Sequence, residues 1–214
     1  MSADLLRHCV VMRVLLLMLF ALFGVSAMAT EEPGFEVVGT REGYELRHYP
    51  GYCVAETEVT GTQADVGNAA FRILAGYIFG GNATQQSIAM TAPVIQAQAE
   101  TIAMTAPVIQ QPSETPGNYV VQFTMPSKYT LDTLPKPNDA RVRLREVRDR
   151  VIAARAYKGG WSLKRYEDEL AALRAAMQRD GLVAVSEPQW ARYNSPFSLP
   201  FMRRNEIWLE IRAP

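Results

Sequence analysis

The sequence predicts an α+β fold in which two similar strand–strand–helix–strand–strand halves share a distorted β-barrel or one mixed sheet, flanked by two helices. Three observations lead to this prediction. Two segments carry apolar residues at the spacing of an amphipathic helix and end at glycine. Most other segments alternate apolar and polar residues with the period of a strand. This order of elements occurs twice, once on each side of a loop over residues 127–140.

The first 29 residues have the layout of a secretory signal peptide and are set apart from the fold. Arg7 and Arg13 supply positive charge, and residues 14–25 form a mostly apolar run that is short of the roughly 20 residues needed to span a bilayer. Ala27 and Ala29 are the small residues that a signal peptidase accepts. We expect cleavage after Ala29 and a periplasmic or secreted protein with no stable membrane anchor. An uncleaved N-terminal anchor is the alternative.

Residues 30–214 form one expected domain with almost balanced charge. They keep 20 basic and 21 acidic residues, because Arg7, Arg13 and Asp4 precede them. This balance gives no bulk attraction to nucleic acid, so no nucleic-acid partner is expected. Cys53 is the only cysteine of this part and cannot form an internal disulfide. Its place in an alternating stretch predicts a buried structural thiol.

The segment from Tyr44 to Val59 has the pattern of a β-hairpin. Two alternating stretches, Tyr44–Tyr49 and Tyr52–Val59, are separated by Pro50-Gly51. The period of two predicts opposite faces for two sets of side chains: Tyr44, Leu46 and His48 on one, and Glu45, Arg47 and Tyr49 on the other.

The first helix is predicted over residues 62–79. Thr62 with Asp65 three residues later is typical of a variant capping box, and Gly80-Gly81 ends the pattern. The residues at helical spacing are Val66, Ala69, Ala70, Ile73 and Tyr77.

An internal repeat follows the first helix. Residues Ser87–Gln96 return almost unchanged as Thr101–Gln110, a period of 14 residues that is too short for a solenoid unit. The two copies are interpreted as the arms of one hairpin. Pro93 and Pro107 cannot donate to a ladder and are therefore expected at edges or bulges.

The rest of the chain repeats the same order of elements. A strand over 119–125 precedes the loop over 127–140. Beyond this loop the expected elements are strands over 142–147 and 151–157, a helix over 163–177 that ends before Gly181, and strands over 189–193 and 206–211.

Several separated motifs make residues 35–213 similar to the SOUL haem-binding family. Ile-Ala-Met-Thr-Ala-Pro-Val occurs twice, at residues 88–94 and 102–108. The further stretches that agree are Tyr44–Arg47 with Tyr49, Ala55–Thr57, Tyr77–Asn82, Val121–Pro126, Arg192–Asn194 and Arg203–Glu206. The resemblance implies a distorted β-barrel with two flanking helices and a porphyrin in an apolar groove, held through one histidine in some members and without it in others. The duplicated architecture also resembles GyrI-like modules, which bind varied apolar molecules.

His48 is the only histidine in residues 30–214, so it is the only imidazole available to ligate haem iron. The alternative is a strand histidine that is hydrogen-bonded at the rim of the barrel. Met90 and Met104 are predicted to fill the core rather than to supply thioether ligands.

The resemblance places the groove between the first helix and the loop ahead of the last strand. The residues it suggests there are Arg72, Tyr77, Phe197, Phe201, Arg203 and Arg204. The arginines would pair with haem propionates, and the two phenylalanines would cover the macrocycle. In the alternative, the phenylalanines close the core and the arginines are solvated.

Catalytic motifs are lacking in this sequence. It has no His-x-x-x-His pair, nucleophile elbow, phosphate loop or cysteine pair. The first hypothesis is therefore a non-enzymatic protein that holds haem or another tetrapyrrole reversibly for carriage or buffering. An envelope interaction protein with another apolar ligand is the second hypothesis. The third is an enzyme on a small apolar or tetrapyrrole substrate with Glu56, Glu58 or Tyr77 as acid or base.

Overall fold

The computed structural model describes residues 30–63, 65–84, 99–195 and 197–212. The chain divides into two units, Met1–Thr30 and Glu31–Pro214, and the helices and strands of the described residues belong to the second. The predicted signal peptide and the first copy of the repeat, Ser87–Gln96, lie outside the described residues.

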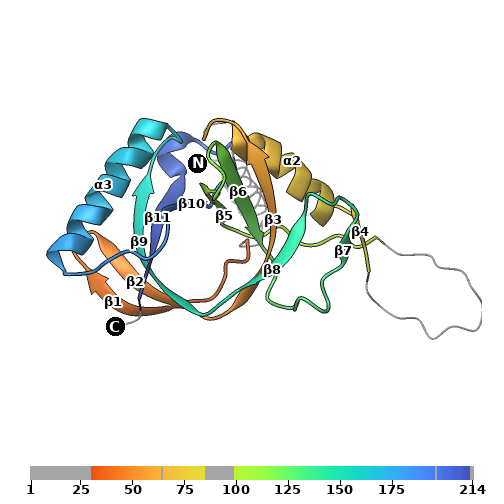
Figure 1. Ribbon diagram of the computed structural model, residues 1–214, viewed down its shortest axis with the longest axis horizontal. Helices are drawn as coiled ribbons and strands as arrows, with labels where there is room; N and C mark the ends of the chain where they lie inside the picture. Colours follow the sequence, from red (N-terminus) through yellow and green to blue (C-terminus); the bar gives the residue numbers. More distant parts are fainter. Residues whose placement is uncertain (1–29, 64, 85–98, 196, 213–214) are drawn as a thin grey trace, which may run out of the picture. The chain divides into compact units, whose positions relative to one another are not determined.

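Two helices and a curled antiparallel sheet form the second unit (Figure 1). The strands of the large sheet are β1 (Glu36–Arg41), β2 (Tyr44–Tyr49), β3 (Tyr52–Thr60), β5 (Val108–Pro112), β6 (Asn118–Thr124), β8 (Arg143–Val147), β9 (Arg150–Lys158), β10 (Gln189–Arg192) and β11 (Arg204–Ile211). The smaller elements are β4 (Asn82–Ala83), which pairs with β7 (Lys136–Pro137), and a 3₁₀ turn, η1 (Pro200–Met202). The helices are α2 (Val66–Ile78) and α3 (Leu163–Arg179), on the outer side of the half-barrel. This confirms the predicted α+β class.

The two predicted halves exchange their first strands. The order of strands is β1-β2-β9-β11-β10-β5-β6-β3-β8, so β2 of the first half pairs with β9 of the second, and β8 of the second pairs with β3 of the first. The hairpin predicted over residues 44–59 is therefore wrong. The hairpin partner of β2 is β1, which the alternation did not reveal, and Gly43 takes the positive φ of 89° that their turn requires.

The hairpin predicted between the two copies of the repeat includes residues 87–96, which lie outside the described residues, so it stays a prediction. Of the second copy, residues Val108–Gln110 lie on β5 and pair with β10 on one edge and with β6 on the other. Pro107, expected at an edge or a bulge, instead directly precedes β5, a strand with a neighbour on each side.

The predicted first helix begins later than expected. Thr62 donates its hydroxyl to Asp65 Oδ2 at 2.6 Å, and the side chain of Asp65 caps no backbone amide, so the reciprocal capping box is absent. Instead the carbonyl of Thr62 accepts from the amides of Asp65 and Val66. On α3, Ser162 is the N-cap and accepts from the Arg165 amide.

The core lies mainly between the convex face of the sheet and the helices. Leu74 of α2 and Leu173 of α3 are fully buried, each at the centre of its own cluster. A third cluster lies on the concave face and contains Tyr49, Ile152 and Trp208. Cys53 is a free, partly exposed thiol beside the α2 cluster rather than the fully buried one expected.

Candidate functional site

His48 lies near the end of β2, in the half of the sheet that α3 covers. Its Nε2 lies 2.8 Å from Oδ2 of Asp149, in the turn between β8 and β9, and its side chain is 34% exposed. This contact corresponds to the interpretation of a strand histidine hydrogen-bonded at the rim. Iron ligation by His48 stays a prediction.

Arg72 and Tyr77 lie together beside a groove of about 810 Å³ along α2. One wall is a face of the helix made by Ala69, Ile73 and Gly76, which follow each other at intervals of four and three residues. The other wall is the segment 138–141, which is part of the loop expected over 127–140.

Hydrogen bonds fix this second wall to the end of α2. The Tyr77 hydroxyl donates to the Pro135 carbonyl at 2.9 Å, and the Asn138 amide donates to the Gly81 carbonyl at 3.0 Å. A side chain at Gly81 would lie 2.6 Å from the Gly76 carbonyl oxygen, so only glycine fits there. Burial raises the pKa of Tyr77, which keeps its hydroxyl protonated as a donor.

Phe197, Phe201 and Arg203 lie on the loop between β10 and β11. Phe197 is 95% exposed and Phe201 is 69% exposed, so neither closes the core as the alternative interpretation had it. Arg203 donates from Nε to the Ser198 carbonyl, and its guanidinium lies 4.3 Å from the centre of the Trp161 ring. None of these loop residues is among those that line the α2 groove.

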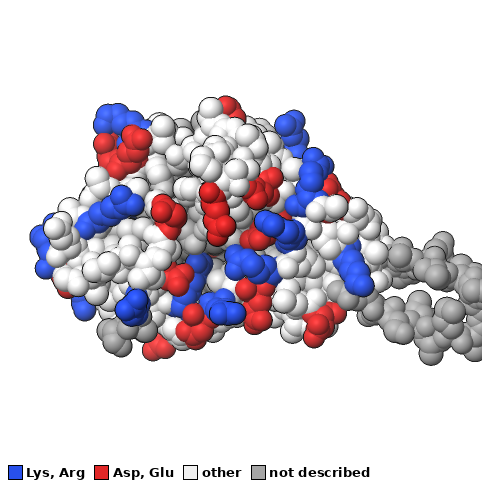
Figure 2. Space-filling view, in the orientation of Figure 1, with Lys and Arg blue, Asp and Glu red and all other residues white. Residues whose placement is uncertain are grey.

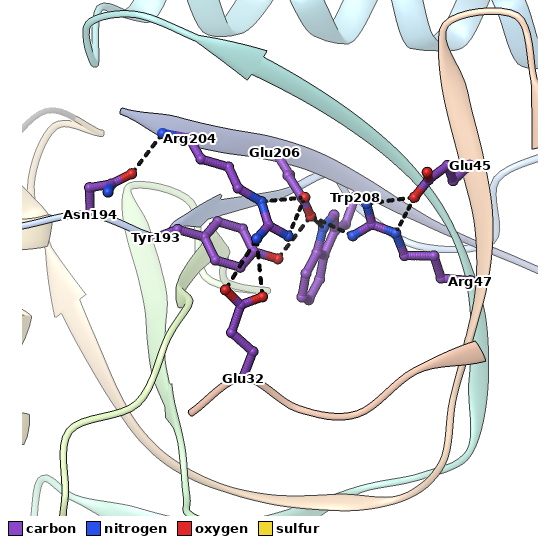
Figure 3. A network of polar contacts seen from close by, with 8 residues as sticks. All are labelled: Glu32, Glu45, Arg47, Tyr193, Asn194, Arg204, Glu206 and Trp208. Carbon is purple, nitrogen blue, oxygen red and sulfur yellow. Dashed lines mark hydrogen bonds and ion pairs between the residues drawn. The ribbon is translucent and has the colours of Figure 1, made fainter. Parts of the chain in front are cut away.

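Arg204 belongs to a different place, the concave face of the sheet (Figure 3). Its Nε and Nη2 donate to Oε1 of Glu206 at 3.1 and 2.9 Å, and its guanidinium lies 3.8 Å from the centre of the Tyr193 ring. Its Nη1 contacts both carboxylate oxygens of Glu32, at 3.1 and 3.2 Å. The adjacent arginines 203 and 204 therefore have different surroundings: Arg203 contacts Trp161 from the loop, and Arg204 begins β11 and contacts Tyr193 and Glu206.

Glu206 is the centre of this concave network and is fully buried. Its Oε2 accepts from Arg47, Tyr193 and Trp208 at 2.7 to 2.8 Å. Burial by itself would raise the pKa of Glu206, but the charge of Arg47, the hydrogen bond from Trp208 and the charge of Arg204 outweigh it and lower the pKa. Sequence reasoning missed this network. Glu206 and Glu210 both stand in the last strand with apolar neighbours, and nothing in the pattern separates the buried Glu206 from the more exposed Glu210.

The two carboxylates considered as catalytic groups lie on β3. Glu56 accepts from Gln122 at 3.0 Å and from Arg145 at 3.1 Å. Glu58 accepts from Ser113 and Asn118, and these hydrogen bonds lower its pKa. A general acid at neutral pH needs a raised pKa, so this arrangement favours ion pairing over proton transfer.

The surface carries charges of both signs. On the face shown in Figure 2, basic and acidic side chains are interspersed and no extended area has a single sign. Within the described ranges, His, Cys, Asp and Glu side chains form no group of three or more placed to hold a metal ion. Among these same residues, no helix has the length and apolar character needed to cross a membrane.

The model of the SOUL heme-binding protein family matches residues 30–210. The chain belongs to the SOUL family. Human heme-binding protein 2 is 30% identical over 190 residues, which cover 86% of this chain and 87% of the human protein. Mouse heme-binding protein 2 is 28% identical over 168 residues, or 78% of this chain and 77% of the mouse protein. SOUL family membership supports haem or another tetrapyrrole as the ligand.

Solved structures share the SOUL fold at low identity. The C-terminal domain of EcmrR has a TM-score of 0.56 and 8% identity, and the match covers 83% of this chain and 98% of that domain. A Listeria innocua protein described as a hydrolase has a TM-score of 0.54 and 12% identity, with 82% of this chain and 94% of that one covered. These likenesses concern the fold alone.

Proposed function

We propose that this SOUL protein binds haem or a related tetrapyrrole reversibly in the groove along α2, and that it makes or breaks no bond in the ligand. We further propose that it does so in the periplasm or after secretion, for carriage or buffering. The N-terminal pattern of residues 1–29 supports this location. The family match and the haem-binding relatives support the ligand class.

The observation that carries the proposal is the small-residue face of α2. Ala69 and Gly76 have little or no side chain, so a ligand can approach the backbone of α2 closely. A side chain added at Gly76 would meet nothing within 4 Å, so there is room for a flat ring. Ile73 between them supplies an apolar contact. The groove volume of about 810 Å³ lies in the usual range for small-molecule sites.

Cations beside this face suit the carboxylates of a tetrapyrrole. Arg72 is exposed and has no ion pair within the described part of the chain, so its guanidinium is available to a propionate. Arg141 on the opposite wall is already paired with Asp139 at 2.6 Å, and this hydrogen bond lowers the pKa of Asp139 to about 2. Arg72 is therefore the cation proposed to recognise the ligand.

This mode of binding does not use His48. That residue lies in the half of the sheet covered by α3, whereas α2 packs on β3 and β6. The groups considered for catalysis support a binding role, because Glu58 has a lowered pKa and the Tyr77 hydroxyl is committed to the Pro135 carbonyl.

A haemin titration of residues 30–214, followed by Soret absorbance, tests the proposal. We expect a saturable shift that Gly76→Trp weakens at least tenfold, because the indole fills the groove while α2 gains helix propensity. Arg72→Glu should weaken binding as well. Arg174→Glu makes the same charge change at an exposed position on α3 and is the matched control.

Two results would contradict this proposal. The first is a titration with no saturable change. The second is binding that His48→Ala abolishes while Gly76→Trp leaves it intact, because that result would place the ligand at His48. Turnover of a porphyrin by the protein would instead support the enzymatic hypothesis.

A second function is favoured by the loop before β11. The described part of this loop exposes four large apolar side chains: Phe197, Leu199, Phe201 and Met202. An exposed apolar group of this kind is typical of a contact surface. An envelope interaction protein would use it to bind an apolar partner, and substitution of Phe197 and Phe201 by Ser would then abolish partner binding without changing the haemin titration.

A further inference from the structure

Residues 31–35, named the strap, lie over the concave network (Figure 3). The Glu31 carbonyl accepts from the Ala106 amide at 2.9 Å, and its carboxylate accepts from the Ser127 amide at 2.7 Å. At the other end, the ring of Phe35 lies 5.2 Å from that of Tyr49. The strap is therefore attached at both ends.

The surface beneath the strap combines flat rings with cationic groups. Tyr49 and Trp208 have ring centres 5.3 Å apart, and the guanidinium of Arg204 lies against Tyr193. Arg47 is almost fully buried and its guanidinium lies 4.5 Å from the centre of the Phe35 ring. The surface thus offers stacking partners and positive charge together.

The strap supplies two groups that this surface does not have. Without it, the two arginines are balanced by Glu45 and Glu206, and Nη1 of Arg204 has no carboxylate. Glu32 brings that carboxylate, and Phe35 brings an aromatic ring between Arg47 and Tyr49. The strap therefore places a carboxylate and an aromatic ring against the sheet, and these are the two groups of an aromatic carboxylate ligand.

We propose that the concave surface around Glu206 binds a small aromatic carboxylate, with its carboxylate on Arg204 and its ring on Tyr49, and that the strap is an intramolecular competitor for this site. Glu32 and Phe35 are three residues apart, so their Cα atoms lie at most about 10 Å from each other, and a small ligand can span the two positions. This site is on the opposite face of the sheet from α2 and goes beyond the tetrapyrrole function proposed above.

The strap is placed so that it can leave. Glu32 and Phe35 are each 37% exposed, and ion pairs at such positions hold weakly. A cavity of about 570 Å³ lies between residues 31–34 of the strap and a wall that includes Tyr52 and Tyr129. This space accommodates either the displaced strap or the remainder of a ligand.

A binding measurement with 2-naphthoate on the full chain tests this inference. Glu32→Gln combined with Phe35→Ala removes the competing groups, and we expect at least tenfold tighter binding than in the unchanged protein, because a competitor tethered to the site acts at high effective concentration. The neutral analogue 2-naphthylmethanol should show no such gain. Glu36→Gln combined with Val38→Ala alters exposed residues of β1 and is the matched control.

Amide hydrogen exchange supplies a second readout in the unchanged protein. The amides of Ala106 and Ser127 donate to Glu31, so saturating 2-naphthoate should speed their exchange as the strap leaves. Arg204→Lys keeps the charge beside Glu206 but loses Nη1, and it should weaken 2-naphthoate at least fivefold. Equal affinity of the unchanged protein and the Glu32/Phe35 variant would overturn the proposal, and so would affinity that Arg204→Lys leaves unchanged.

Discussion

Arg47 and Glu206 form an ion pair at 2.8 Å across the inside of the sheet, although β9 lies between their strands. In the register, Arg47 pairs with Ile152 and Glu206 with Ala156, so Ala154 is the residue of β9 between them on this face. Ala154 is only 2% exposed, so the small size of this residue is what lets a long side chain pass.

The first prediction follows from this crossing. Ala154→Leu should lower the free energy of unfolding by about 1–3 kcal/mol, because the larger side chain displaces Arg47 from its path. Urea unfolding measures the loss. In a protein that already carries Arg47→Met, Ala154→Leu should lower the free energy of unfolding clearly less. Equal losses with and without Arg47→Met would contradict the idea that Ala154→Leu acts by displacing Arg47.

Glu206→Gln should destabilise the fold by about 3–5 kcal/mol at pH 7, because the change leaves two arginines without their shared buried carboxylate. The pKa of Glu206 is lower in the folded state than in the unfolded state. The ionised carboxylate therefore contributes fully to the free energy of unfolding above the ordinary carboxylate pKa, and this contribution is lost as pH falls through the folded-state pKa. Urea unfolding at several values between pH 7 and pH 3 should therefore show a flatter acid dependence in the variant. An unchanged slope would mean that other carboxylates control acid unfolding.

Arg192 is partly buried beside two indole rings and has no carboxylate partner in the described residues. Its guanidinium lies 4.0 Å from the centre of the Trp190 ring and 5.0 Å from that of Trp161, and its Nε has no hydrogen-bond acceptor. Burial lowers the pKa of Arg192 to about 10.

The pKa of Arg192 is lower in the folded state than in the unfolded state, so burying the charged guanidinium lowers the free energy of unfolding at neutral pH. This loss of stability diminishes only as pH rises through about 10. Arg192→Met should therefore raise the free energy of unfolding by ~1 kcal/mol at pH 7, since a thioether also packs well on indole rings. Thermal or urea unfolding measures the change. A loss of stability would show that the contact with the two indoles outweighs the cost of the buried charge.

Leu74→Ala on α2 and Leu173→Ala on α3 should each cost about 2–5 kcal/mol, because both side chains are fully buried. The exchanged strands β2 and β8 join the two halves of the sheet, so each variant should still unfold in one transition. Circular dichroism and tryptophan fluorescence should give coincident curves. Separate transitions would mean that the halves are independently stable.

Local patterns predicted most of the elements correctly. Glycine and apolar spacing located α2 and α3, and alternation located β6, β8, β9 and β11, because these properties depend on neighbours in the sequence. The same reasoning paired Tyr44–Tyr49 with Tyr52–Val59 and was wrong, because alternation identifies a strand but carries no information on its partner. The edge strand β1 was missed because it is largely exposed and shows little periodicity.

The predicted site residues are distributed over four places. Arg72 and Tyr77 share the α2 groove, Phe197, Phe201 and Arg203 lie on the loop near Trp161, and Arg204 lies on the concave face. The fourth place is the rim, where His48 contacts Asp149. These residues were predicted because their side chains suit haem binding. Which of them lie close together depends on how the sheet curls.

The sequence by itself determined the α+β class, the duplicated order of elements and the SOUL resemblance, because these reside in composition, period and short motifs. Only the tertiary structure decided that the halves exchange strands and that Arg47 meets Glu206 from 159 residues away. The physical reason is that strand pairing and burial of charge are settled by the packing of the whole sheet. No stretch of the chain short enough to show a pattern contains both partners.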